Sequence, residues 1–163
     1  MTYIICPIKQ EEVAPARRLI YSVAHEVYQD TRSLEESMAF YDSKGVLEDM
    51  DDVQGSYFDD DGTFLVMVEG DQIIGTGAIK RLDTDICELK RLWFLKEYRG
   101  KGLGYKMTRE LLSFARDKGY QRVRLETDPV AQLQALNFYK RLGFYEIPQY
   151  SQHQDETALE LVL

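Results

Sequence analysis

The sequence predicts a single mixed α+β domain, residues 1–163, in which helices pack on a central sheet. The chain has 163 residues and is 44% hydrophobic, which is enough for one real core. Its segments read as strand, two helices, three strands, helix, strand, helix and two strands. Because strands and helices do not alternate regularly, a Rossmann domain is not expected. No internal repeat, low-complexity segment or linker divides the chain.

The first third of the chain contains one expected strand and two expected helices. "TYIICPI" reads as a strand. A second helix is expected near Leu34–Asp42, where Ser33 can cap the start and Glu36 can complete a capping box. The acidic stretch Glu48–Gly62, "EDMDDVQGSYFDDDG", is expected to be mostly loop. The first helix, between residues 11 and 28, is predicted from apolar residues at helical spacing, namely Val13, Leu19, Ile20, Val23, Ala24 and Val27.

The remaining elements are expected in close succession. "TFLVMVEGDQIIGTGAIKRL" reads as two strands around a tight "EGDQ" turn, and "DICELKRLWFL" as a third strand. "GLGYKMTRELLSFARDKG" is expected to be a helix that ends at Gly119, and "QRVRLET" a strand. "PVAQLQALNFYKRLG" is expected to be a helix with Pro129 near its start and Gly143 after its end. "FYEIPQY" and "TALELVL" are the last two expected strands.

Composition excludes several classes of function. The net charge of −8 argues against a general nucleic-acid binder, since phosphate contacts need clustered Lys and Arg. The N-terminus lacks the features of a signal peptide, and no apolar run is long enough to span a bilayer, so a cytoplasmic protein without a membrane partner is expected. The two cysteines, Cys6 and Cys87, cannot form a disulfide framework and are expected to be buried thiols.

A glycine-rich loop precedes the helix predicted after the third apolar strand. In "RGKGLG", residues 99–104, glycines alternate with other residues at the start of that helix. A helix start leaves backbone N–H groups without partners and carries partial positive charge, and glycines let a ligand approach that backbone closely. Arg99 and Lys101 add charge, so the loop suits a pyrophosphate. It lacks the Lys-Ser/Thr ending of a P-loop, which disfavours ATP held by that device.

Two motifs together resemble the GNAT superfamily of N-acetyltransferases. "RGKGLG" matches the family's Arg/Gln-x-x-Gly-x-Gly/Ala motif at Arg99, Gly102 and Gly104. "NFYKRLGF" is similar to its C-terminal element, in which an aromatic-Tyr pair precedes Gly-Phe. The resemblance covers Thr63–Phe144 well, and the order of elements extends it over the chain. It implies a GNAT-like fold, with a mostly antiparallel central sheet and helices on both faces.

The resemblance also implies that the chain binds acetyl-CoA as its co-substrate. The loop amides would hold the pyrophosphate, and the backbone of the "LWF" segment would pair with the pantetheine amides like an added strand. Asn137 or Gln132 could bond the cofactor, although exposure on a helix explains both equally well. The residues implied in cofactor binding are Leu92, Trp93, Phe94, Arg99, Gly100, Lys101, Gly102, Leu103, Gly104, Tyr105 and Asn137.

Acetyl transfer to an amine requires two proton transfers, and the resemblance suggests a residue for each. Tyr139 occupies the family's Tyr position in "FYKRLGF" and would be the acid that serves the leaving thiolate. Glu88 lies eleven residues before Arg99, as a catalytic glutamate does in one branch of the family. Strand alternation places Glu88, Lys90, Leu92 and Phe94 on one face, unless a bulge shifts the phase.

Several alternatives remain open at this point. Glu88 and Lys90 could be a surface pair, another branch would place its glutamate at Thr127, next to Glu126, and some members use only water. His25 and His153 are isolated, so no metal is expected. The acidic run 48–61 could be a solvated loop or a rim that attracts a cationic acceptor.

The expected activity is acetylation of a primary amine, with a small cationic amine as the acceptor. A protein or peptide N-acetyltransferase and a catalytically silent CoA-binding regulatory module of the same fold are the alternatives. The sequence is compatible with a homodimer as well as with a monomer.

Overall fold

The computed structural model describes residues 2–163 and contains one seven-stranded sheet. The strand order is β1-β2-β3-β4-β5-β7-β6, in which β4 and β5 pair in parallel and the other neighbours are antiparallel. The strands are β1 (Ile4–Pro7), β2 (Thr63–Glu69), β3 (Gln72–Arg81), β4 (Ile86–Phe94), β5 (Arg122–Thr127), β6 (Tyr145–Ile147) and β7 (Thr157–Val162). The helices are α1 (Val13–Val27), α2 (Leu34–Ser43), α3 (Val53–Ser56), α4 (Leu103–Asp117) and α5 (Leu133–Arg141).

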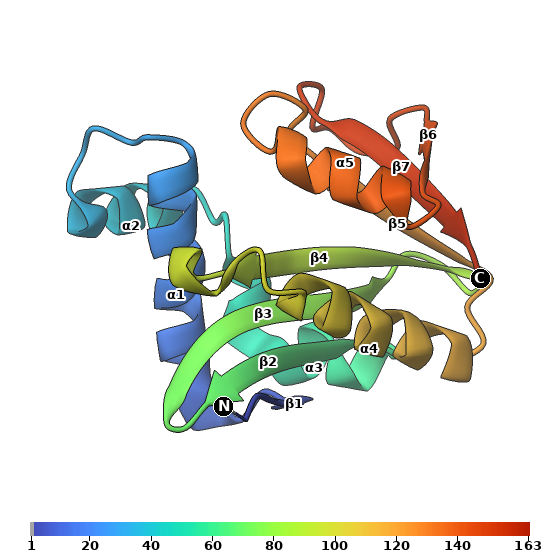
Figure 1. Ribbon diagram of the computed structural model, residues 1–163, viewed down its shortest axis with the longest axis horizontal. Coiled ribbons are helices and arrows are strands. Elements are labelled where there is room, and N and C mark those ends of the chain that lie inside the picture. The colour runs from blue at the N-terminus through green and yellow to red at the C-terminus, as the bar shows by residue number, and fades with distance from the viewer. Residues whose placement is uncertain (1) are drawn as a thin grey trace.

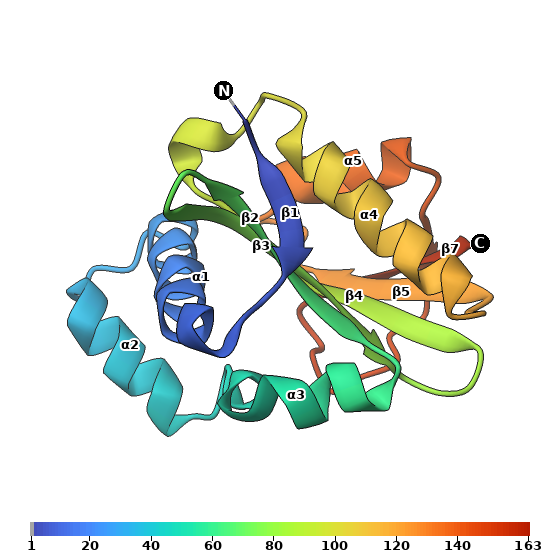
Figure 2. The same cartoon turned by 90° about the horizontal axis from the view of Figure 1, so that it is seen from below.

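Helices cover both faces of the sheet, as Figures 1 and 2 show. On one face, Phe64 and Val66 of β2 pack into a core with α1 and the segment around α3. On the other face, the alternate residues Leu65 and Met67 pack into a core with α4 and α5. The apolar run of β2 is therefore buried on both sides, because side chains alternate between faces along a strand. The prediction of a mixed, mostly antiparallel sheet with helices on both faces is confirmed.

The predicted cap of α2 is present in a modified form. The Ser33 hydroxyl accepts a hydrogen bond from the Glu36 backbone N–H at 3.1 Å. The Glu36 carboxylate accepts from that same hydroxyl at 3.0 Å, instead of from the backbone N–H of Ser33. The hydroxyl therefore satisfies one of the open N–H groups of the helix start, while the reciprocal half of a capping box is replaced.

The start of α5 and the length of β6 differ from the predictions. The helix begins at Leu133 rather than near Pro129, because the Asp128 carboxylate accepts hydrogen bonds from the N–H groups of Val130 and Ala131 and forms a separate turn. Strand β6 ends before Pro148, which has no N–H to continue a ladder.

The prediction that residues 48–62 are mostly loop was wrong. The segment consists of a 3₁₀ helix (Glu48–Asp52), α3 and a second 3₁₀ helix (Phe58–Asp60). Met50, Val53 and Tyr57 are buried in the core beneath α1. Their spacing of three and four residues places them on one helical side, whereas the acidic residues between them obscure that pattern.

Two expectations from composition can be compared with the structure. Cys87 is fully buried, whereas Cys6 is partly exposed, and both are free thiols. Burial raises the pKa of the Cys87 thiol to about 12, so it is protonated at neutral pH. Across residues 2–163, the helices are all too short or too polar to cross a bilayer.

Candidate active site

The two parallel strands at the centre of the sheet separate after a short paired stretch. Residues 86–88 of β4 pair with residues 122–124 of β5, and the pairing ends at Glu88. Beyond that point β4 continues to Phe94 beside β3, while β5 leads towards α5, so the strands form an open fork (Figure 1). Within the described chain, the backbone of Leu92–Phe94 has a strand partner only on its β3 side.

A cleft of about 810 Å³ occupies the open side of this fork. Its walls come from β4, the end of α1, the glycine-rich loop, the start of α4, and α5 with the turn before it. Glu88, Lys101 and Asn137 are not among the residues that line it. The predicted residues that do line it are Leu92, Trp93, Phe94, Arg99, Gly100, Gly102, Leu103, Gly104, Tyr105 and Tyr139.

A bulge in β4 changes which face its side chains occupy. Thr76 of β3 pairs with Trp93 and Ala78 pairs with Lys90, so two residues of β4, Arg91 and Leu92, lie opposite one residue of β3. Leu92 and Phe94 therefore join Leu89 in the core under α4, while Trp93 packs on the α1 side. The prediction that Glu88 and Lys90 share a face with Leu92 and Phe94 was wrong for the last two.

Arg91 at this bulge has an unusual backbone conformation. Its φ of +60° lies in the left-handed region. This conformation costs a residue with a side chain roughly 1–2 kcal/mol relative to the right-handed region. Contacts around Arg91 must offset that cost, so the surrounding structure holds β4 in this conformation.

The start of α4 has the properties of an anion site. Its first residue follows Gly102, which has a φ of +78° and provides no side-chain cap. The first N–H groups of the helix consequently lack intrahelical partners and carry the positive end of the helix dipole. A Cβ atom added at Gly102 or Gly104 would meet no other protein atom within 4 Å, so open space lies over this backbone. The residues present fit a pyrophosphate group.

The basic side chains near the glycine-rich loop differ in the groups that they contact. Arg99 Nη2 lies 2.8 Å from Glu26 Oε1 of α1, and Arg99 Nε donates to the Phe94 carbonyl at 2.9 Å. Lys101 Nζ instead lies over the Tyr98 ring, 5.5 Å from its centroid. Arg141, at the end of α5, also lines the cleft. Arg141 was not predicted from the sequence, although its position two residues after Tyr139 in "FYKR" is a usable signal.

Tyr139 lies in the wall that α5 contributes to the cleft. Its side chain is buried, and its ring packs edge-on against Phe138 and Phe144 at centroid distances of 5.4 and 5.6 Å. Burial raises the pKa of the Tyr139 hydroxyl well above its ordinary value, because desolvation penalises the phenolate. The side chain is therefore a fixed, protonated hydrogen-bond donor at neutral pH.

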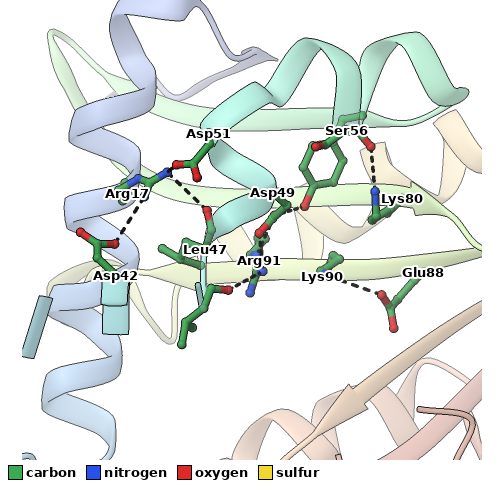
Figure 3. Close-up of polar contacts among 12 residues, drawn as sticks. Arg17, Asp42, Leu47, Asp49, Asp51, Ser56, Lys80, Glu88, Lys90 and Arg91 are labelled. Carbon is green, nitrogen blue, oxygen red and sulfur yellow. Dashed lines mark hydrogen bonds and ion pairs between the residues drawn. The ribbon is translucent and has the colours of Figure 1, made fainter. Parts of the chain in front are cut away.

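Glu88 lies at the vertex of the fork, on the face that α1 and α3 cover. It is the last residue of β4 that pairs with β5, opposite Arg124. Its carboxylate accepts a hydrogen bond from the Tyr150 hydroxyl at 2.6 Å. The carboxylate also lies 3.7 Å from Lys90 Nζ, as Figure 3 shows. Tyr150 was missed because no local pattern links a residue after β6 to one in β4. The predicted Glu88–Lys90 pair is present but long.

A polar cluster extends from Glu88 along β5. Glu126 lies two residues beyond Arg124 on the same face and accepts a hydrogen bond from Ser151 Oγ at 2.6 Å. The ligating atoms of Glu126, His153 and Glu156 lie within 4.8 Å of one another, in an arrangement that could hold a metal ion. No metal-ligand spacing is visible in the sequence here, because these residues come from β5 and from the segment before β7, which only the fold brings together. Thr127, where another branch of the family would have its glutamate, donates a hydrogen bond to Gln132 Oε1 at 3.2 Å.

Comparison with known proteins gives a consistent family match. The model of the acetyltransferase (GNAT) family matches residues 21–144. N-acetyltransferase 8B of Rattus norvegicus is 36% identical over 116 residues, which cover 68% of this chain and 52% of the relative. An uncharacterised N-acetyltransferase of Escherichia coli (strain K12), YjgM, is 38% identical over 87 residues, or 52% of this chain and 51% of the relative. The chain spans about half the length of the curated relatives it matches.

Solved structures show the same architecture over the whole chain. An acetyltransferase of the GNAT family from Staphylococcus aureus Mu50 superposes with a TM-score of 0.84 at 19% identity, covering 99% of both chains. The PaiA N-acetyltransferase of Thermoplasma acidophilum, solved in complex with coenzyme A, gives a TM-score of 0.80 at 20% identity and covers 100% of both. At these identities the likeness establishes the fold.

Proposed function

The chain belongs to the acetyltransferase (GNAT) family, and from this membership we propose that it transfers an acetyl group from acetyl-CoA to a primary amine. The observation that carries the proposal is the cleft in the β4–β5 fork. One wall is a strand edge that has no partner among residues 2–163, and the mouth is a helix start without a side-chain cap and with open space over its glycines. A linear ligand with amides at one end and phosphates at the other fits both features.

The residues of this chain divide the binding of CoA between two elements. The N–H groups from Gly102 to Tyr105 hold the pyrophosphate, and Arg99 and Arg141 supply nearby positive charge. The backbone of Leu92–Phe94 pairs with the pantetheine amides, while Leu92 and Phe94 pack into the core under α4. The PaiA structure, which has the same fold, was solved with coenzyme A, and this supports CoA as the ligand.

The chemistry requires a donor beside the thioester sulfur and a base beside the amine. When bound, acetyl-CoA supplies the thioester carbonyl that a neutral amine attacks. Tyr139 donates a hydrogen bond where thiolate charge develops. The pKa of an ordinary phenol, near 10, exceeds that of a thiol, near 8.5, and burial raises the pKa of Tyr139 further, so Tyr139 stabilises the thiolate charge through this hydrogen bond while its proton stays mainly on the phenol oxygen. The backbone N–H of Phe94 supplies a donor for the oxyanion.

Glu88 is our candidate for the base. It lies at the fork vertex on the face opposite the α4 core, and Tyr150 fixes the orientation of its carboxylate. Because Glu88 does not line the cleft itself, it acts on the amine through an ordered water or through an acceptor bound on its own face. Glu126, on the same face, is the second choice.

A small cationic amine is the acceptor class that the charges favour. Glu88, Glu126 and Glu156 gather around the vertex of the fork. Burial raises the pKa of the Glu156 carboxyl, and the neighbouring carboxylates Glu126, Asp128 and Glu88 raise it further, while His153 opposes the shift. Such carboxylates attract an ammonium group and repel an anionic acceptor.

The function is tested by an acceptor screen that measures thiol release from acetyl-CoA. The panel should span polyamines, amino acids, aminoglycosides and peptides, with calorimetry of CoA binding beside it. We expect the chain to bind CoA and to release thiol from acetyl-CoA in a manner that depends on a small amine. Binding without release for any acceptor indicates a silent CoA-binding module, and release only with peptides indicates a protein-modifying enzyme.

Replacing Glu26 with Gln should tighten CoA binding by roughly two- to fivefold, a size typical of a half-exposed ion pair. The Glu26 carboxylate lines the mouth of the cleft and engages Arg99, so it competes with a pyrophosphate for that guanidinium. Glutamine keeps the shape and removes the charge. Calorimetry at low and high salt provides the measurement, with Glu35→Gln, which removes a mostly exposed ion pair with Arg18, as the control. Weaker binding would show that the pair positions Arg99.

Replacing Glu88 with Gln should lower turnover at neutral pH and leave CoA affinity unchanged. The deficit should shrink as pH rises towards 10, because more of the amine then arrives already neutral. The measurement is kcat/KM against pH at saturating acetyl-CoA, with Glu146→Gln as a control distant from the fork. A deficit that stays constant through alkaline pH would contradict the assignment. In that case a water-only route comes first, and Glu126 second.

A further inference from the structure

The bulge of β4 is held from two sides by buried polar contacts. The Arg91 side chain makes a double contact with Asp49, Nε to Oδ2 at 3.1 Å and Nη2 to Oδ1 at 2.7 Å (Figure 3). Arg91 Nη2 also donates to the Val46 carbonyl at 3.2 Å. From the sheet side, the hydroxyl of the fully buried Thr76 donates to the Arg91 carbonyl at 2.6 Å. The side chain and the backbone of the same left-handed residue are thus both fixed.

Asp49 is itself held in place and charged. The hydroxyl of Tyr57, a residue with no exposed surface, donates to its Oδ2. Burial pushes the pKa of the Asp49 carboxyl upward, but the hydrogen bonds and charge of Arg91 outweigh this and hold the pKa below its ordinary value. Only 11% of the Asp49 side chain and 18% of the Arg91 side chain are exposed, so water screens the pair weakly.

The segment that carries Asp49 is fixed to α1. Arg17 lies 2.6 Å from Asp51 Oδ1, donates to the Leu47 carbonyl at 3.3 Å and contacts Asp42 of α2 at 3.4 Å (Figure 3). A side chain of the first helix therefore holds the acidic segment against the sheet. This segment is not a solvated loop, and at Asp49 its charge is used to restrain β4.

We propose that Arg91 and Asp49 are positioning residues that fix the β4 bulge and thereby aim the backbone of Leu92–Phe94 into the cleft. This proposal rests on the proposed function, because the aimed backbone is the one assigned to the pantetheine arm. The bulge puts Trp93 on the α1 side and Leu92 on the α4 side. A strand without the bulge would exchange these two faces and would reverse which backbone groups point towards the cleft.

If the pair is broken, we expect CoA to lose selectively the part of its binding affinity that comes from the pantetheine arm. The wild-type chain should bind CoA more tightly than the phosphoadenosine diphosphate fragment, which lacks the arm. Asp49→Asn should weaken CoA binding about tenfold, equivalent to about 1.4 kcal/mol. Affinity for the fragment should stay unchanged, because the start of α4 lies far from α3 in Figure 2, and the 3₁₀ helix that contains Asp49 comes directly before α3.

The chain offers a direct spectroscopic reporter and a matched control. Trp93 is its only tryptophan and lies two residues after Arg91. In Asp49→Asn, acrylamide should quench Trp93 fluorescence more strongly than in the wild type. Asp60→Asn removes the ion pair with Arg81 from the same acidic segment and should change neither quenching nor affinity. Arg91→Lys, which keeps the charge but loses the double contact, should show the same selective loss on a smaller scale and serves if Asp49→Asn does not fold.

Three results would overturn the proposal, and each differs from a failure of the proposed function. CoA and the fragment could weaken equally in both variants, which is the result of a general loss of structure. The arm contribution could survive intact, or Trp93 quenching could stay at the wild-type value. If instead the wild-type chain does not bind CoA, the proposed function fails, while the quenching comparison still decides whether the pair holds the bulge.

Discussion

A Gly104→Val variant is expected to fold normally and to lose CoA affinity by at least roughly 10²-fold, or about 2.7 kcal/mol. Gly104 lies in the first turn of α4 with no positive φ, so valine can adopt its backbone conformation. Apart from its neighbours in the helix, its added Cβ would meet no protein atom within 4 Å, so the side chain would project into the open space where we propose that the pyrophosphate binds. The damage should therefore fall on the ligand and not on the core.

The control for this variant is a valine elsewhere on the same helix. Ser113→Val also places a β-branched residue on α4, at an exposed position that does not line the cleft. It shows what a β-branched residue on this helix does to stability away from the cleft. Calorimetry of CoA and thermal unfolding should be measured for both variants. Unchanged CoA binding in Gly104→Val would remove the pyrophosphate assignment. Gly102→Val should bind as weakly but be less stable, because its φ of +78° disfavours a side chain.

The sequence predicts most of the fold because its strong signals are local. The "RGKGLG" loop, the stripe of α4 and the buried run of β2 each depend on a few neighbouring residues, and the structure contains all three. The prediction that the acidic segment, residues 48–62, is mostly loop was wrong for the opposite reason. Its buried residues Met50, Val53 and Tyr57 have helical spacing, but they lie among aspartates that suggest solvent. What stabilises that segment is Arg17 and Arg91, which are distant in sequence.

The parts of the candidate site that could be predicted have local sequence signals. Leu92–Phe94, the glycine loop and Tyr139 could be placed because a strand pattern, glycine spacing and a short motif each follow the chain, and all of them line the cleft. The bulge at Arg91 could not, because a left-handed arginine has no local signature and exists through contacts with Asp49 and Thr76. Side-chain neighbours across the sheet, such as Tyr150 beside Glu88, depend on the register of strands far apart in the chain.

Replacing Tyr139 with Phe is expected to lower kcat by roughly 10²-fold, the usual size of a general-acid contribution. Affinity for CoA should change little, because the ring, its packing with Phe138 and Phe144, and the cleft wall all remain. The hydroxyl acts on charge that develops only as the thiolate departs, so its loss raises the barrier without weakening the ground state. Since burial raises the pKa of Tyr139, its deprotonation should not produce an alkaline limb below pH 10.

Tyr120→Phe provides the matched control for that experiment. Tyr120 is another buried tyrosine, but its hydroxyl donates to the Asp61 carbonyl at 2.9 Å, away from the cleft. Its removal should cost stability, because the partly buried hydrogen bond between Tyr120 and the Asp61 carbonyl is lost, and should leave kcat unchanged. Tyr139→Phe should show the reverse pattern of unchanged stability and reduced kcat. The decisive measurement is single-turnover thiol release, in which chemistry is observed directly. Full turnover in Tyr139→Phe under those conditions would make Tyr139 a packing residue, and the thiolate would then leave without an acid from α5.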